Sequence, residues 1–270
     1  MRPPVAEPPF LQHRPLEPGI APCGSETFVF DVATQSAAGA PDFEGVRVFQ
    51  DFVSEAEAVQ LLAEIERTPF APAQSGKQKQ HFGPRMNFRK RKMNAKGFDG
   101  LPRYAHWLEA RLRVRAADAG LRAALVPWVT TDAFVLRYLE AECSNLDPHV
   151  DDLWAYGELI VDLSLESDGW LTFLDRDPQD GIDGAFRCVR VPAPARSLVA
   201  LFGAARTRWC HGVSYRDIEG RRTSITLRTL GHAVRETVEG AAVLERAGRA
   251  LPAPPPVSLE PEKRGGIAGR

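Results

Sequence analysis

The residues with the clearest capacity for chemistry are His149 and Asp151, a His-x-Asp pair in a chain of 270 residues. Alone the pair is weak, because six histidines and 35 acidic residues give roughly even odds of one His-x-acid match by chance. A second histidine, His211, follows 62 residues later in the apolar run 209–213. Two imidazoles and one carboxylate cover one face of Fe(II) and leave three positions open for a bidentate 2-oxo acid and O₂. The order and spacing therefore predict an Fe(II) centre formed by His149, Asp151 and His211.

A cation follows at Arg222, beside a strand predicted over residues 223–229. Alternation along that strand places four polar side chains on one face, namely Arg222, Ser224, Thr226 and Arg228, whereas Ile225 and Leu227 face the other way. A dicarboxylate cosubstrate needs a fixed cation for its far carboxylate, and the planar guanidinium fork provides one. The strand is therefore predicted to line a polar cavity.

Taken singly, each feature has an ordinary structural explanation. A His-x-Asp pair is usually a surface turn, a lone histidine usually belongs to a core, and a lone arginine is usually a solvated charge. Their order, spacing and shared strand face together favour an Fe(II)/2-oxo acid site.

These residues need a scaffold, and the pattern predicts an α+β fold. A capping box of Ser54 and Glu57 begins a helix that Pro69 ends, and a second helix is expected over residues 101–115. Short β-rich runs separated by turn residues predict an antiparallel jelly-roll core with supporting N-terminal helices. The predicted strands are residues 27–32, 46–52, 133–138, 158–165, 170–174, 186–191, 196–202, 208–213 and 223–229.

Composition excludes several classes of protein. The net charge is −1, with 44% hydrophobic and 26% charged residues, which are ordinary globular values. The chain shows no apolar stretch long enough for a membrane helix and no secretory signal, and its four cysteines fit no zinc motif. Reduced thiols and a cytoplasmic or nuclear location are therefore expected. Proline-rich composition predicts disordered tails over residues 1–25 and 251–270, which flank one domain over residues 26–250.

Residues 77–96 carry eight basic residues and no acid, with His81, Phe82 and Phe88 among them. Three interpretations stay open. The block could contact nucleic-acid phosphates with aromatic rings available for stacking, dock an acidic protein substrate, or form a solvated run or nuclear-localisation patch at residues 89–92.

Three blocks of sequence resemble the AlkB-like Fe(II)/2-oxoglutarate dioxygenases, most closely their fourth animal branch. They are Gln-Ser-Gly-Lys at 74–77 with Gly-Pro-Arg-Met-Asn-Phe-Arg-Lys at 83–90, Asp-Pro-His-Val-Asp-Asp at 147–152, and residues 194–222 with Trp209, His211 and Arg222. The resemblance spans roughly residues 43–232. It implies a double-stranded β-helix over residues 128–232 and iron held by His149, Asp151 and His211. It further implies that Tyr138, Arg222 and Arg228 bind 2-oxoglutarate. Residues 74–96 would form a basic substrate lid that includes Arg85, Asn87, Phe88 and Arg89.

The leading functional hypothesis is oxidative N-demethylation with Fe(II), 2-oxoglutarate and O₂. The resemblance implies methyl-lysine in protein or N6-methyladenine in nucleic acid as the substrate, and a methylated base would have to be flipped into the pocket. One alternative is hydroxylation of a small molecule or protein side chain without demethylation. Another is a catalytically idle basic binding module. The sequence predicts no membrane partner and does not indicate an oligomeric state.

Overall fold

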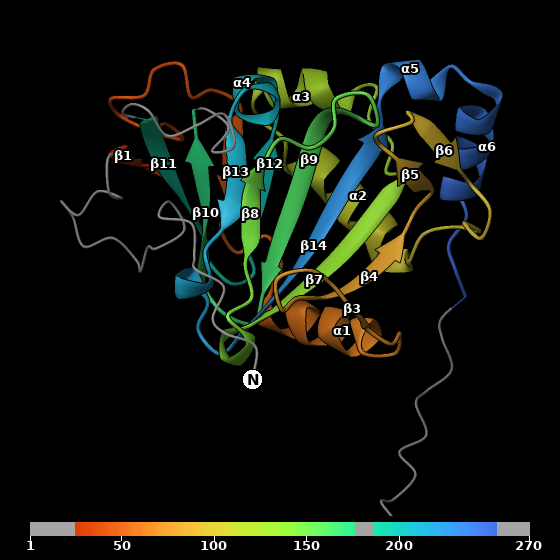
Figure 1. Ribbon diagram of the computed structural model, residues 1–270, viewed down its shortest axis with the longest axis horizontal. Helices are drawn as coiled ribbons and strands as arrows, with labels where there is room; N and C mark the ends of the chain where they lie inside the picture. Colours follow the sequence, from red (N-terminus) through yellow and green to blue (C-terminus); the bar gives the residue numbers. More distant parts are fainter. Residues whose placement is uncertain (1–24, 176–185, 253–270) are drawn as a thin grey trace, which may run out of the picture.

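The computed structural model describes residues 25–175 and 186–252. Alternating apolar runs form two facing sheets, drawn in Figure 1. The larger sheet has the strand order β2-β12-β9-β14-β7-β4-β3 and the smaller has the order β1-β11-β10-β13-β8. Among the described residues, the two sheets pair antiparallel throughout except where β1 lies parallel to β11. The fold is the expected double-stranded β-helix of the α+β class.

The bounds of the elements are as follows. The larger sheet consists of β2 (Val46–Phe49), β3 (Ala71–Pro72), β4 (Gln78–Phe82), β7 (Asp132–Leu139), β9 (Tyr156–Leu165), β12 (Leu198–Leu201) and β14 (Arg221–Leu230). The smaller consists of β1 (Ser25–Val29), β8 (Leu146–His149), β10 (Gly169–Leu174), β11 (Phe186–Ala193) and β13 (Cys210–Val213). A separate hairpin pairs β5 (Arg85–Asn87) with β6 (Lys92–Asn94). The helices are α1 (Glu55–Ile65), α2 (Arg103–Arg115), α3 (Ala119–Leu125), α4 (Gly203–Thr207), α5 (His232–Arg235) and α6 (Val238–Ala247).

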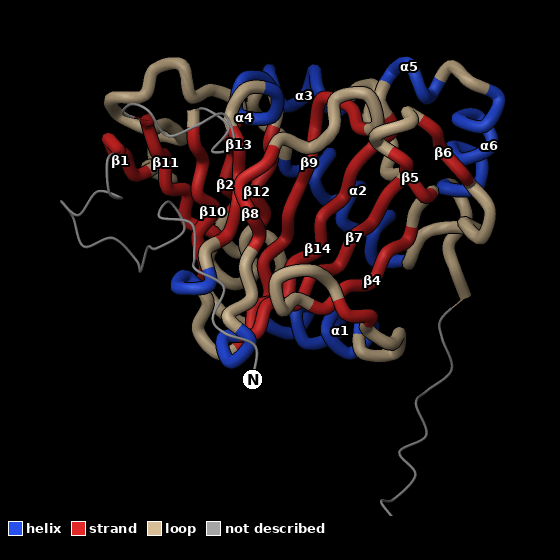
Figure 2. The backbone as a smooth tube through the Cα atoms, in the orientation of Figure 1, coloured by secondary structure: helices blue, strands red, loops and turns tan. Residues whose placement is uncertain are grey.

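Helices cover the outer face of the larger sheet. Leu61 of α1, Leu108 of α2 and Leu121 of α3 are buried in one apolar cluster with Leu163 and Ile225 of the sheet. In Figure 2 the helices α2 and α3 pass behind the strands of this sheet. Burial of these alternate strand positions fixes which face each strand turns inward, because a one-residue slip would expose them.

A second apolar cluster fills part of the space between the sheets. It joins Leu136 and Ile160 of the larger sheet to Phe173 and Val189 of the smaller, and Trp209 packs into it. The opposite parity to the helix-facing residues means that each central strand contributes to both layers. The cavity described below lies in the part of this layer that the second cluster leaves open.

The predicted helices and most predicted strands are confirmed within a few residues. Ser54 caps α1, and the Glu57 side chain accepts from the Ser54 backbone N–H, which completes the expected capping box. No helix was predicted at α3, α4, α5 or α6; the apolar residues of α3, α5 and α6 pack on the outer face of the larger sheet. No strand was predicted over residues 146–149, whereas His149 ends the strand β8.

The predicted disordered tails lie almost entirely outside the described residues, as does Cys23. Cys143, Cys188 and Cys210 are not joined in disulfides within the described part of the chain. No helix in the described part of the chain is both long and apolar enough to cross a bilayer.

Candidate metal and cosubstrate site

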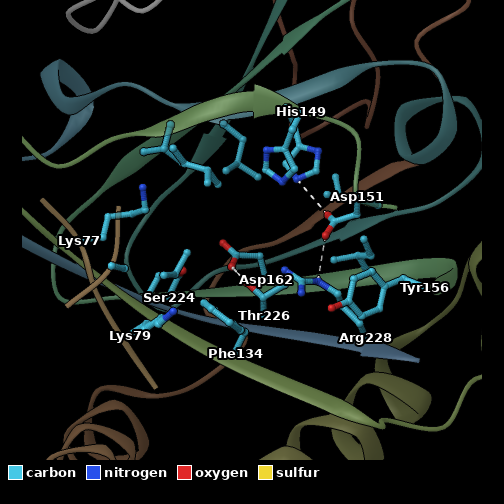
Figure 3. Close-up of a pocket in the computed structure, with 18 of the residues that line it drawn as sticks. Lys77, Lys79, Phe134, His149, Asp151, Tyr156, Asp162, Ser224, Thr226 and Arg228 are labelled. Carbon is cyan, nitrogen blue, oxygen red and sulfur yellow. Dashed lines mark hydrogen bonds and ion pairs between the residues drawn. The ribbon is translucent and has the colours of Figure 1, made fainter. Parts of the chain in front are cut away.

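The three predicted metal ligands converge at one edge of the cavity (Figure 3). His149 on β8 and His211 on β13 are direct cross-strand partners, and their ring centroids are 4.6 Å apart. Asp151 follows two residues after His149, so the chain leaving β8 carries its carboxylate back towards the imidazoles. One ligand atom from each residue lies within 4.8 Å of the others. The sheet register, together with the turn after β8, therefore creates the triad.

The protonation states of these residues suit a metal ion. Nδ1 of His149 lies 2.8 Å from the backbone oxygen of Asp147, which can only accept, so Nδ1 donates to it and leaves Nε2 as the nitrogen available to a metal ion. Burial lowers the pKa of His211 to about 3, so its imidazole is neutral at pH 7. Burial alone would raise the pKa of Asp151, but Arg228 and the neighbouring histidines lower it to about 2. The site thus presents two imidazole nitrogens and one carboxylate as ligand groups.

The spacing also fits a shared ion. Nε2 of His211 lies 3.5 Å from Oδ2 of Asp151, which is too long for a strong hydrogen bond between them. Ligand atoms at about 2.1 Å from one ion and at right angles to each other lie about 3 Å apart. The donor set and the spacing therefore fit Fe(II) bound on one face.

A buried arginine holds the loop that carries Asp151. Arg206 of α4 is 1% exposed, and its Nη1 donates to the backbone oxygen of Asp151 at 2.8 Å. Its other guanidinium nitrogens donate to the backbone oxygens of Tyr156 and Gly157. The sequence reading did not assign a role to Arg206. An arginine directly after the small residues 203–205 was the available signal.

The cavity has a volume of about 590 Å³ and lies between the two sheets. Arg222, Ser224, Thr226 and Arg228 all line it, whereas Ile225 and Leu227 are buried against the helices. The predicted division of β14 into a polar and an apolar face is therefore confirmed. Tyr138 of β7, the other residue predicted to bind 2-oxoglutarate, lines the same cavity.

The two arginines of β14 occupy different surroundings. Arg222 is 1% exposed; its Nη2 donates to Oγ of Ser164 at 2.6 Å and to Oδ2 of Asp162 at 3.0 Å, and its guanidinium lies 5.4 Å from the Tyr138 ring. Nε of Arg228 lies 3.2 Å from Oδ1 of Asp151. Arg222 thus pairs with Asp162 inside the cavity, whereas Arg228 stands beside Asp151 of the triad.

The basic block contributes Lys77, Lys79 and Phe88 to the cavity, whereas the other individually predicted lid residues do not line it. Phe88 lines it, with its ring centroid 6.2 Å from that of Tyr156. Arg85 and Arg89 are exposed on the hairpin and are not lining residues, and the Asn87 side chain accepts from the Lys90 backbone N–H in the hairpin turn. Met86 and Met93 pack on the main core. The hairpin is therefore an anchored element rather than a free tail.

Three further residues of the cavity were not assigned from the sequence. Lys77 and Lys79 line it, and burial lowers the pKa of Lys77. Asp162 lines it from β9. The available signal for Asp162 was an acid between the apolar residues Val161 and Leu163 in a predicted strand, because a charge at such a position needs a partner.

Comparisons with known proteins agree with this site. No protein-family model matches the chain. The human protein "alpha-ketoglutarate-dependent dioxygenase alkB homolog 4" is 34% identical over 211 residues, which cover 70% of this chain and 68% of the relative. The Caenorhabditis elegans "DNA N6-methyl adenine demethylase" is 30% identical over 216 residues, which cover 80% of this chain and 69% of the relative.

Among solved structures, a Pseudomonas putida prolyl-4-hydroxylase superposes on 72% of this chain and 96% of its own, with a TM-score of 0.44 and 17% identity. The fold assignment rests on the strand order given above, and the family assignment rests on the curated relatives. The chain carries the expected iron triad in the expected fold. It therefore belongs to the AlkB family of Fe(II)/2-oxoglutarate-dependent dioxygenases.

Proposed function

We propose that this dioxygenase is an oxidative N-demethylase, with His149, Asp151 and His211 as its metal ligands. In this proposal Arg222 and Tyr138 bind the far carboxylate of 2-oxoglutarate, and Arg228 stands at the metal end of the same cavity. A bound Fe(II) with 2-oxoglutarate and O₂ supplies the oxidation of an N-methyl carbon, with succinate, CO₂ and formaldehyde as the products. The observation that carries the proposal is the triad's position at the edge of a cavity also lined by Arg222 and Tyr138.

The residues of the chain have separable tasks. The carbonyl of Asp147 and the guanidinium of Arg206 orient the ligands His149 and Asp151. The apolar walls of the cavity, which include Leu171 and Val213, limit access of water to the reacting groups. Phe88 lines the same cavity from the hairpin and would orient the substrate's methyl group.

The hairpin favours a nucleic-acid substrate. Arg85, Arg89, Lys90, Arg91 and Lys92 are all exposed on it, and the Phe88 side chain is 48% exposed. Basic side chains next to an exposed ring can hold phosphates while a flipped base stacks on the aromatic face. Of the two substrate classes, we therefore propose a methylated base such as N6-methyladenine ahead of methyl-lysine in protein. The relative from Caenorhabditis elegans, named for N6-methyladenine demethylation, supports the same choice.

The test is formaldehyde and succinate release with Fe(II), 2-oxoglutarate and O₂. The substrates are N6-methyladenine oligonucleotides and methyl-lysine peptides of matched concentration, with unmethylated versions as controls. Formaldehyde from the oligonucleotide, lost in His149→Ala, would support the proposal. Release from the peptide alone would overturn the choice of substrate. Succinate formation with a stable hydroxylated product and no formaldehyde would identify the alternative, a hydroxylase. Failure of the wild-type protein to turn over any substrate would favour the binding-module alternative.

A further inference from the structure

A carboxylate lies inside the cosubstrate end of the cavity. Asp162 belongs to β9, where its neighbours Val161 and Leu163 are buried in the cluster that packs against the helices. Strand alternation therefore turns Asp162 the other way, into the cavity, where Figure 3 shows it near Thr226. The residue is only 7% exposed. A buried carboxylate of this kind requires compensating donors.

Asp162 takes those donors from the residues that face the cosubstrate. Its Oδ2 accepts from Nη2 of Arg222 at 3.0 Å, and its Oδ1 accepts from Oγ1 of Thr226 at 2.8 Å. Both oxygens are thus engaged, and both donors belong to the polar face of β14. Asp162 therefore contacts the guanidinium of Arg222, which in the proposed function also binds the far carboxylate of the cosubstrate.

The guanidinium has limited capacity for a second carboxylate. Its Nη2 already serves Asp162 and Ser164, and its Nε has no hydrogen-bond partner among the described residues. Because that Nε is buried, a ligand carboxylate would have to bind the remaining guanidinium nitrogen, Nη1, and it would then lie close to Asp162 on the same cation. The repulsion energy of two like charges a few ångströms apart is several times larger in a partly desolvated cavity than in water.

We infer that Asp162 competes with the far carboxylate of 2-oxoglutarate for Arg222, and so weakens the affinity of this enzyme for dicarboxylate ligands. The inference rests on the proposed role of Arg222. It makes Asp162 a specificity-determining residue: the penalty falls on ligands that carry a carboxylate at the far end, which include 2-oxoglutarate and succinate. A 2-oxo acid without that group binds the metal end and avoids the penalty.

The test compares Asp162→Asn with wild type. Asparagine keeps the shape and can turn its oxygen to Arg222 and its amide to Thr226, so the change removes mainly the charge. Isothermal titration of Mn(II)-loaded protein uses two probes of equal chain length, 2-oxoglutarate and 2-oxopentanoate. We expect the Kd of 2-oxoglutarate to fall on the order of tenfold in Asp162→Asn, with the Kd of 2-oxopentanoate unchanged.

A matched control neutralises a different carboxylate that also pairs with an arginine. Asp42 accepts from Arg187 at 2.6 Å and does not line the cavity, so Asp42→Asn should leave both Kd values as in wild type. Mn(II) affinity and thermal unfolding check that each variant is folded. Asp162→Ser, which retains a hydroxyl acceptor, replaces Asp162→Asn if the latter does not fold.

The outcomes separate this inference from the proposed function. An unchanged or raised Kd for 2-oxoglutarate in Asp162→Asn would overturn the inference and identify Asp162 as a positioning residue for Arg222. An equal fall for both probes would also overturn it, because the effect would then not depend on the far carboxylate. Failure of Mn(II)-loaded wild type to bind 2-oxoglutarate would overturn the assignment of Arg222 itself, and the inference with it.

Discussion

Arg222 and Arg228 stand six residues apart on the same face of β14, and both are paired with carboxylates, yet their surroundings differ. Arg228 lies between Asp151 and Asp132, and Asp132 is 1% exposed and also lies 2.6 Å from Nε2 of His81. Arg222 has Asp162 as its acidic partner, and that residue lines the cavity.

The difference separates a structural pair from an exchangeable one. Arg228 joins the metal ligand Asp151 to a carboxylate outside the cavity lining, so removing it leaves a buried charge without its main partner. Arg222 pairs with Asp162, which itself lines the cavity, so a ligand in the cavity can replace that partner. In the proposed function, one strand thus supplies both a fixed support for the metal ligands and a binding group for the cosubstrate.

The largest effect is expected at the metal ligands themselves. His149→Ala should reduce succinate formation below detection, because two ligands cannot hold Fe(II) on one face in the same way. Far-UV circular dichroism should remain that of wild type, since His149 ends an edge strand. Retained turnover in a folded His149→Ala protein would contradict the assignment of His149 as an iron ligand.

Substitutions of the two arginines should lower the free energy of unfolding by different amounts. Arg228→Met should lower the free energy of unfolding by about 3 kcal/mol, because it leaves Asp132 buried without its guanidinium. Arg222→Met should lower it by roughly half as much, since Asp162 keeps Thr226 and faces the cavity. Urea unfolding of the metal-free proteins measures both. Equal losses would contradict the division into a structural and an exchangeable pair.

Cosubstrate affinity, unlike stability, should depend more on Arg222 than on Arg228. Arg222→Lys keeps the charge but loses the guanidinium fork, and we expect the Kd of 2-oxoglutarate to rise by about tenfold with Mn(II) affinity unchanged. The measurement is isothermal titration of the metal-loaded protein. If Mn(II) binding weakened instead, Arg222 would support the metal ligands, as Arg228 does, and would not be a cosubstrate-binding residue.

Acidification should affect the metal end of the cavity. Burial holds the pKa of His211 at about 3, below its ordinary 6.5, so the unfolded chain takes up a proton that the folded chain does not. The metal-free protein should therefore lose stability as the pH falls from about 6.5 towards 3, by at most about 1.4 kcal/mol for each pH unit. Urea midpoints between pH 7 and pH 4 should fall less steeply in His211→Gln than in wild type. Identical slopes in the two proteins would contradict the lowered pKa of His211.

At the hairpin, the expected effect falls on the substrate and not on the metal or the cosubstrate. Reversing the charge of Arg85 and Arg89 to glutamate should raise the KM for a methylated oligonucleotide by about tenfold and reduce its salt dependence. The Kd of 2-oxoglutarate should not change, because neither residue lines the cavity. Arg103→Glu with Arg122→Glu, two exposed arginines on α2 and α3, is the matched control. An unchanged KM after reversal of the Arg85 and Arg89 charges would argue against phosphate contact at the hairpin.

Local sequence determined much of this protein. Period-two alternation specified both the strands and the polar face of β14, because a strand between two apolar layers must divide its residues by parity. The Ser54–Glu57 box specified where α1 begins, because its hydrogen bonds are made within four residues. The triad itself was predicted from spacing and residue type, and the structure brings its three members together.

Long-range packing determined the rest. The pairing of His149 with His211 depends on the register of β8 against β13, two strands far apart in sequence, and no local preference sets that register. The position of Asp162 beside Arg222 likewise follows from β9 and β14 being neighbours in the larger sheet. Residue types and spacing therefore determined which chemistry is possible. Only the tertiary structure decided which charges share a cavity, because electrostatic partners are set by distance in space and not by distance along the chain.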